Sequence, residues 1–274
     1  MAPVFYTWDT SVWCSVAQLA VDDLEYSDKI EKRLVNLITA DNLAPEVLKI
    51  NPTGTLPAIA TGDAFYTSTA EVVSYLASNA TIKVAPATAL TEAVHSDELD
   101  PNFAFLSARN EEELAKVSVF GKVYSQNRYD ALKRYAATPD AEPFRAFYEK
   151  KIALVADALA LYSGTAPDAA KQGYFARSTT IWASFRTFIF ETLPAALAKS
   201  EGQFLGGERP GEDDFHVGGW LSRISLVSGA TTVEQAPGKL EERLGGPIPE
   251  SVQKYLQAWG QRPSWQKVYA DRLH

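Results

Sequence analysis

The sequence predicts an α+β protein in which a short domain of mixed strands and helices precedes a longer, all-helical domain. Up to about residue 80, short apolar runs alternate with segments of helical spacing. From about residue 100 onward, apolar residues recur every three or four positions, as in amphipathic helices. The segment between them has little pattern and contains Pro86. We therefore expect domains at residues 1–82 and 99–274, joined by a linker at 83–98.

The first domain is expected to follow the order β-α-β-α-β-β-α. The predicted elements are a strand at 4–6, a helix at 12–20, a strand at 33–38, a helix at 45–49, strands at 56–60 and 64–66, and a helix at 69–78. Gly62-Asp63 separates the last two strands and indicates a hairpin. Pro45 suits the first turn of a helix.

The second domain is predicted to be helical throughout. Apolar residues between 141 and 162 keep helical spacing, and Gly164 follows as a stop signal. A second stripe contains Ile181, Trp182, Phe185, Phe188 and Ile189. Such aromatic stripes usually form core.

Composition excludes several classes of protein. The chain of 274 residues has 26 basic and 34 acidic side chains, a net charge of −8, which argues against nucleic acid as the main partner. One cysteine excludes an intrachain disulfide framework and a cysteine-rich zinc module. The 13 Phe, 12 Tyr and 6 Trp residues can fill a core or line a pocket for flat ligands.

The sequence shows no targeting or membrane segment. The first residues lack a basic region followed by an apolar one, and Asp9 comes early. The least polar stretch near the start, 12–21, is interrupted by Ser15 and Gln18 and is too short to cross a bilayer. We therefore expect a cytoplasmic protein without a membrane partner.

The most specific segment is Asn51-Pro52-Thr53-Gly54-Thr55-Leu56-Pro57-Ala58-Ile59. Pro57 begins a strand, where proline removes a ladder hydrogen bond. It can be a trans proline on an edge strand. Alternatively, a cis Leu56–Pro57 bond turns the preceding backbone outward, as an edge for a peptide-like ligand.

This segment resembles the N-P-x-G-x-V-P-A-L signature of glutathione transferases. The segment 67–76 is similar to the family's T-E-S-x-A-I-x-x-Y-L helix start, and 204–215 resembles its later F-L-x-G…S-x-A-D element. The three matches occur in order and cover nearly the whole chain. The segments 207–216 and 262–265 further resemble a fungal-specific class, class A, of wood-decay basidiomycetes.

The resemblance implies a thioredoxin-like N-terminal domain, an all-helical C-terminal domain, a homodimer, and glutathione as cosubstrate without a metal. Glutathione's cysteinyl backbone would pair with Leu56, beside a cis Pro57. Its γ-glutamyl carboxylate would lie at the helix start at Thr69, where backbone N–H groups favour an anion. The fungal class implies that plant-derived polyphenols and other aromatic compounds also bind.

Two positions depart from the family pattern. Ser68 stands where the family has Glu, so a carboxylate for the ligand's ammonium group has to come from elsewhere, with Glu71 as the candidate. Ala44 stands near a position that often holds a Lys for the glycyl carboxylate.

Ser11 is the preferred catalytic residue. Tyr6 is an alternative because it aligns with the Tyr that other classes of the family use. Cys14 is an alternative as the nucleophile of a thiol-transfer enzyme. A thiol with a pKa of about 8.5 is only about 3% thiolate at pH 7. Lowering that pKa by about two units requires about 2.7 kcal/mol. One hydrogen bond to the charged sulfur, about 1.5–3 kcal/mol, with about 0.3–1 kcal/mol from a helix N-terminus, can supply it.

Ser11-x-x-Cys14 has the spacing of a C-x-x-C motif whose first, exposed sulfur has become a hydroxyl. Cys14 is then expected to face inward as a small hydrophobe. Asp213-Asp214-x-His216 has residue types that bind metals but lies at a predicted helix start, so we expect a structural role.

We therefore expect a detoxifying glutathione transferase that conjugates hydrophobic electrophiles or reduces peroxides. The acceptor is expected to contact aromatic side chains, namely Trp8, Trp13, Phe120, Tyr124 and Trp182. Two alternatives are a non-catalytic, ligandin-type carrier of aromatic compounds and a thiol transferase that uses Cys14.

Overall fold

The computed structural model describes residues 2–274, so that Met1, the first residue of the expected domain 1–82, lies outside the described residues. Its four-stranded sheet contains β1 (Val4–Thr7), β2 (Glu31–Leu34), β3 (Ala58–Ala60) and β4 (Phe65–Tyr66), in the order β2-β1-β3-β4. β2 is parallel to β1, whereas β3 and β4 are antiparallel to their neighbours. This thioredoxin-like sheet and the helical domain that follows confirm the predicted fold class.

The sheet is flanked by short helices. In chain order they are α1 (Val12–Asp23), η1 (Ser27–Lys29), η2 (Asp41–Leu43), α2 (Pro45–Leu48) and α3 (Thr69–Asn79). The predicted order of elements is confirmed, but the second strand ends at Leu34 instead of spanning 33–38. The chain leaves the sheet there because the Asn36 side chain accepts a hydrogen bond from the Ile38 N–H and forms a turn (2.8 Å).

Helices account for the rest of the chain. They are α4 (Ala89–Val94), η3 (Asp97–Leu99), α5 (Pro101–Leu106), α6 (Glu111–Ala136), η4 (Pro139–Phe144), α7 (Arg145–Tyr162), α8 (Asp168–Thr187), the π-helical turn η5 (Phe188–Thr192), α9 (Leu193–Leu197), α10 (Glu212–Val227), α11 (Ala236–Leu244), α12 (Glu250–Gly260) and α13 (Pro263–Val268). The helix predicted at 141–162 becomes regular only at Arg145, since Pro143 interrupts the preceding turn. None of the helices in the described part of the chain is long and apolar enough to span a bilayer.

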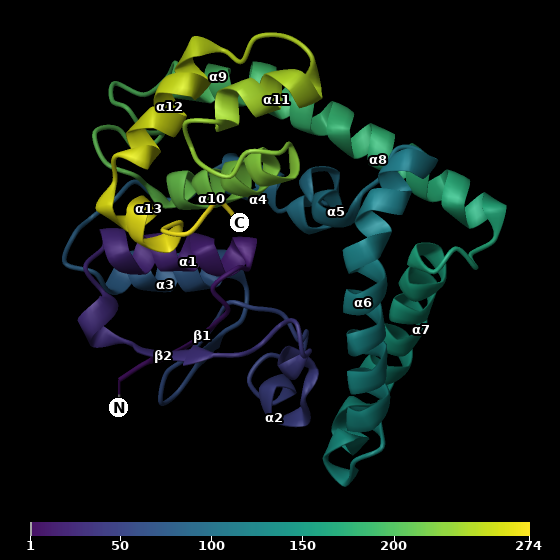
Figure 1. The fold of residues 1–274 in the computed structure, drawn as a ribbon. Helices are drawn as coiled ribbons and strands as arrows, with labels where there is room; N and C mark the ends of the chain where they lie inside the picture. The colour runs from purple at the N-terminus through teal and green to yellow at the C-terminus, as the bar shows by residue number, and fades with distance from the viewer. Residues whose placement is uncertain (1) are drawn as a thin grey trace.

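The helices α1 and α3 form a layer between the sheet and α10 (Figure 1). One core cluster contains residues of both domains, including Val16, Val73 and Trp220. α10 approaches α1 closely at Gly219, where a Cβ atom would lie 2.5 Å from Val16 Cγ2. A side chain at position 219 would therefore push the two domains apart.

Two carboxylates at the start of α10 hydrogen bond to neighbouring segments of the chain and hold them against this helix. Asp214 accepts hydrogen bonds from the backbone N–H groups of Leu205, Gly206 and Gly211, at 2.7–2.8 Å. Asp213 accepts from the hydroxyl groups of Thr88 and Thr91, at 2.6 and 2.8 Å. The predicted structural role of this acidic segment is confirmed, and the segment 83–98 is held against α10.

A long antiparallel hairpin of α6 and α7 extends beside the first domain, near α2 (Figure 1). The Tyr148 hydroxyl on α7 donates to the Leu43 carbonyl (2.8 Å), and Arg128 Nη1 on α6 donates to the Leu37 carbonyl (3.4 Å). The hairpin thus packs against the segment between β2 and α2.

Candidate functional site

A cavity of about 430 Å³ lies between the first domain and the hairpin. Its lining includes six of the predicted site residues, namely Trp8, Ser11, Trp13, Leu56, Phe120 and Tyr124. They come from the start of α1, the segment before β3, and α6. The structure thus brings together a polar candidate, a backbone edge and an aromatic wall that are far apart in the sequence.

Ser11 is the N-cap residue of α1 and is half-buried at the cavity. Its backbone is extended, and its carbonyl accepts the N–H of Ser15 (2.8 Å). Among residues 2–274, its hydroxyl makes no capping hydrogen bond to the helix. The side chain acts instead on the nearby Cys14 thiol, whose pKa it lowers. A hydroxyl at a helix N-terminus, without a capping role, is able to stabilise an anionic sulfur.

Cys14 and Tyr6 lie in a less accessible environment. Cys14 is 1% exposed, and burial raises the pKa of its thiol even though Ser11, Trp8 and Thr7 hydrogen bond it. It lines a second cavity, which has Trp8 and Thr10 in common with the first but does not include Ser11. The Tyr6 hydroxyl accepts a hydrogen bond from Arg33 Nη1 (3.1 Å), and Tyr6 lines neither cavity.

The Leu56–Pro57 peptide bond is cis, as expected from the resemblance. Among the described residues, the N–H and C=O groups of Leu56 have no hydrogen-bond partner. Leu56 lines the cavity, so this backbone edge is available for a peptide-like ligand.

The buried side chain of Asn51 holds this segment in place. Its amide nitrogen donates to the carbonyls of Thr55 (2.9 Å) and Thr67 (3.0 Å), and its oxygen accepts from the Thr53 N–H (3.0 Å). Asn51 therefore links the residues before the cis peptide to those before α3.

The helix α3 begins at Thr69, as predicted from the sequence. Ser68 is its N-cap residue and forms a capping box with Glu71. Glu71 Oε2 accepts from the backbone N–H groups of Thr67 (2.8 Å) and Ser68 (3.0 Å), which lowers the pKa of Glu71. Thr69 is the first helical residue and is buried. Glu71 Oε1 has no partner among residues 2–274, so the carboxylate keeps one oxygen for a ligand.

Two cations that the sequence analysis missed lie on the hairpin. Ala44 is buried and provides no charge, but Arg128 and Lys151 line the cavity together with Asn42 and Gly54. Burial, together with the Arg128 charge, lowers the pKa of Lys151. Both residues lie more than 40 positions beyond residue 82, so their proximity to the first domain follows only from the packing of the hairpin.

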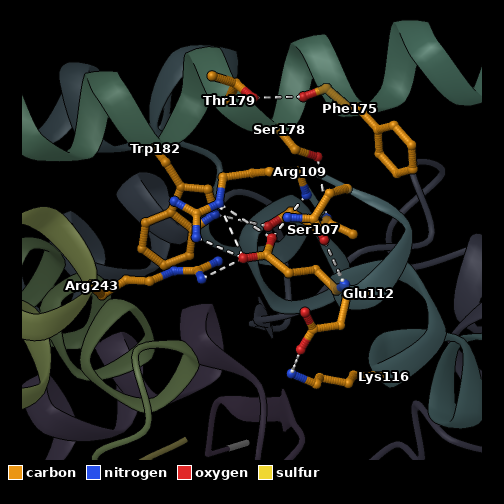
Figure 2. Close-up of polar contacts among 12 residues, drawn as sticks. Ser107, Arg109, Glu112, Lys116, Phe175, Ser178, Thr179, Trp182 and Arg243 are labelled. Carbon is orange, nitrogen blue, oxygen red and sulfur yellow. Dashed lines mark hydrogen bonds and ion pairs between the residues drawn. The ribbon is translucent and has the colours of Figure 1, made fainter.

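Trp182 lies away from the cavity, in contrast to the prediction. It is 4% exposed, its indole N–H donates to Ser107 Oγ (3.1 Å), and Arg243 lies over its ring (Figure 2). Glu113 accepts from both Arg109 (2.6 Å) and Arg243 (2.8 Å). Burial acts to raise the pKa of Glu113, but these hydrogen bonds outweigh it and hold the pKa at about 2.

Among residues 2–274, no group of three or more His, Cys, Asp or Glu side chains is arranged to hold a metal ion.

Residues 5–83 match the family described as glutathione S-transferase, N-terminal domain. The whole chain has the fold of several solved structures. Glutathione transferase F7 from Populus trichocarpa is 15% identical, with 98% of each chain covered and a TM-score of 0.51. The β-etherase LigF from Sphingobium sp. strain SYK-6 is 12% identical, with 98% of this chain and 99% of that chain covered and a TM-score of 0.53.

Glutathione transferase E6 from Drosophila melanogaster is 15% identical, with 98% of this chain and 91% of that chain covered and a TM-score of 0.50. No curated protein matches the sequence significantly. The chain therefore has the fold of these glutathione transferases, and its first domain matches the glutathione S-transferase N-terminal family.

Proposed function

We propose that the protein is a glutathione transferase that activates the glutathione thiol through Ser11 and transfers it to aromatic or other hydrophobic electrophiles. The observation that carries the proposal is the cavity in which Ser11, the unpaired backbone of Leu56 and an aromatic wall meet. The segments 207–216 and 262–265 support a place in the fungal-specific class A, whose implied ligands include plant polyphenols.

In this proposal, glutathione lies along Leu56 with its γ-glutamyl carboxylate at the start of α3. The N–H groups of Thr69 and Ala70 open this helix and favour an anion. Glu71 Oε1 receives the ammonium group. Arg128 and Lys151 take the part of the missing lysine at position 44 and bind the glycyl carboxylate.

The Ser11 hydroxyl then donates a hydrogen bond to the sulfur. The thiol loses its proton to solvent, and the thiolate attacks the electrophilic carbon. With a chloroaromatic acceptor, a C–S bond forms and chloride leaves with the bonding electron pair. With an isothiocyanate, the sulfur adds to the central carbon and the nitrogen takes up a proton. Each reaction uses only the electron pair of the thiolate.

A carrier of aromatic compounds is the second candidate, because Trp13, Phe120 and Tyr124 line the cavity whether or not turnover occurs. A thiol transferase that uses Cys14 is less favoured, since burial raises the pKa of this thiol and the thiolate is the reactive form.

Ser11→Ala, Cys14→Ser and Tyr6→Phe variants test the proposal in conjugation of 1-chloro-2,4-dinitrobenzene. We expect Ser11→Ala to lower kcat/KM by about 10- to 100-fold, the effect of losing a hydrogen bond of about 1.5–3 kcal/mol to a charged sulfur. The apparent pKa of bound glutathione, read from the pH–rate profile, should rise toward that of a free thiol. The other two variants should retain most activity.

Loss of activity in Cys14→Ser with an unchanged Ser11→Ala would overturn the proposal in favour of thiol transfer. Tight binding of a hydroxylated aromatic compound, with negligible conjugation of any electrophile by the wild type, would favour the carrier.

The proposal also includes a cytoplasmic homodimer and domain boundaries at 1–82 and 99–274 with a linker at 83–98. Sedimentation velocity measures the expected dimer directly.

A further inference from the structure

The cavity is basic, although the chain as a whole is acidic. Four cationic side chains line it, namely Arg128, Lys151, Arg223 and Arg272, whereas no Asp or Glu is among its lining residues. The complete chain has 34 acidic against 26 basic side chains. If the charged residues of the cavity reflected the composition of the whole chain, they would include carboxylates. The positive charge is therefore a local feature of the cavity and points to an anionic ligand.

Arg223 is the least accessible of these cations. Its side chain comes from α10, is 6% exposed, and donates from Nη2 to the carbonyl of Thr10 (2.8 Å). Its Nε is buried without a hydrogen-bond partner among residues 2–274. Neither Arg223 nor Arg272 forms an ion pair with a carboxylate in the described structure. A buried guanidinium without a counter-ion is costly unless a ligand supplies one.

The surroundings of Arg223 are aromatic. Its guanidinium lies 4.8 Å from the centroid of the Phe105 ring. Phe105 packs edge-on against Phe120, which stacks on Tyr124, with 5.6 Å between ring centroids in each pair. Trp8 adds a second buried donor without a partner, its Nε1, to the same lining. The lining thus combines a strip of flat apolar surface with two residues, Arg223 and Trp8, that each have a buried donor without a partner among residues 2–274.

Arg223 is not one of the residues to which the carboxylates of glutathione are assigned. It is bonded to Thr10, the residue before Ser11, and so lies next to the place of the reactive sulfur. The two carboxylates of glutathione are assigned to the start of α3 and to Arg128 and Lys151. Burial lowers the pKa of Arg223 to about 10, so the guanidinium stays charged at neutral pH.

We propose that the acceptor half of the cavity selects anionic aromatic compounds, such as phenolates and aryl carboxylates, whose negative oxygen pairs with Arg223 while the ring lies on Phe105, Phe120 and Tyr124. Arg272 assists from the C-terminal segment. This inference rests on the proposed function for the place of the sulfur. The binding of the anionic ring itself requires no turnover.

Isothermal titration of the full-length protein with 2-naphthoate and 2-naphthamide tests the inference. The two ligands have nearly the same shape but differ in charge at pH 7. We expect the wild type to bind the carboxylate at least about tenfold more tightly, as for one charge-assisted pair. Arg223→Gln should remove this preference, Arg223→Lys should retain part of it, and Arg272→Gln should reduce it about threefold.

Arg134→Gln is the matched control, because Arg134 is exposed on the same hairpin but does not line the cavity. It should leave both affinities unchanged. Circular dichroism shows whether Arg223→Gln folds. If it does not, the preference of the wild type for the carboxylate and its reduction in Arg272→Gln, a substitution at an exposed residue, still test the inference. Equal binding of the two ligands by the wild type overturns the inference.

A repeat titration with saturating S-methylglutathione distinguishes this inference from the proposed function. Retained naphthoate binding supports a separate acceptor site. Competition between the two ligands would mean that the cations serve glutathione, and would overturn the inference. A protein that prefers naphthoate but does not bind S-methylglutathione would refute the proposed function and leave the anionic aromatic site standing.

Discussion

Ser11 and Cys14 lie one helical turn apart but in different environments. The first side chain reaches the cavity at the start of α1, whereas the second is 1% exposed. The same spacing in a C-x-x-C motif would place one sulfur outside and one inside. The helix start therefore determines which residue is able to meet a ligand, and the residue type determines the chemistry available there.

Glu71 has two roles in the proposed site, and one substitution separates them. Glu71→Gln keeps an oxygen that accepts the N–H groups of Thr67 and Ser68 but removes the charge. We expect the KM for glutathione to rise several-fold while the unfolding temperature changes little. Steady-state kinetics and a thermal melt measure the two effects.

Glu71→Ala is the comparison, since it removes the capping acceptor as well. It should also lower the stability of the protein by about 1 kcal/mol, a typical value for a helix cap. An unchanged KM in Glu71→Gln would show that the carboxylate serves the cap without contacting the ligand's ammonium group.

Individual residues could be predicted from the sequence where a local motif determines their role. The cis Leu56–Pro57 bond, the inward Cys14 and the structural Asp214 all belong to short motifs. Arg223 and Trp182 could not be placed in this way. Each lies on a helix whose neighbours come from distant parts of the chain, and helical spacing alone does not show which neighbours these are.

At the scale of elements, Glu113 connects α6 to α11 through Arg109 and Arg243. The pKa of Glu113 in the folded protein is about 2, below its ordinary value of 4.5, so the folded state favours the ionised form. Its stabilising effect is present above about pH 4.5 and is lost as the pH falls toward 2.

We predict that Glu113→Gln lowers the free energy of unfolding at pH 7 by about 1–2 kcal/mol, a range that allows for partial solvation of the carboxylate. The difference from the wild type should shrink as the pH falls from 4.5 toward 2. Urea titrations at several pH values provide the measurement.

Glu112→Gln is the matched control, since this neighbour is exposed and pairs with Lys116 alone among the described residues. Its unfolding midpoint should match that of the wild type at every pH. A pH-independent difference in Glu113→Gln would contradict the role assigned to the charge.

The elements themselves were largely predictable, because hydrophobic periodicity and turn residues are local signals. The residues at which the elements begin and end were less predictable. β2 is an exposed edge strand, so its pattern of apolar residues does not mark its limits. The hairpin of α6 and α7 was expected as helices, but its position beside Gly54 depends on tertiary contacts, such as that of Tyr148 with Leu43.

At the scale of the whole molecule, the two domains share one core. Val16 and Val73 of the first domain and Trp220 of the second belong to the same buried cluster. Separating the domains would expose these apolar faces to water, at about 25 cal/mol for each Å² of apolar surface. The domains are therefore expected to stabilise each other.

We predict a single cooperative unfolding transition for the full chain. Far-ultraviolet circular dichroism follows the helices, and tryptophan fluorescence reports on Trp8 and Trp13 in the first domain as well as on Trp220 in the second. The two transitions should coincide. Separate transitions, with the first domain unfolding apart from the second, would show that the shared core does not couple them.

The hydrogen bonds of Asn51 have a consequence for how ligands exchange. One amide group ties the backbone near Leu56 to the chain just before α3, so the two ends of the proposed peptide-binding edge cannot shift independently. The opposite side of the cavity is a helical hairpin that meets this region through contacts such as that of Arg128 with Leu37. We expect ligand entry and release to depend on outward movement of the hairpin tip, while the backbone near Leu56 keeps its position.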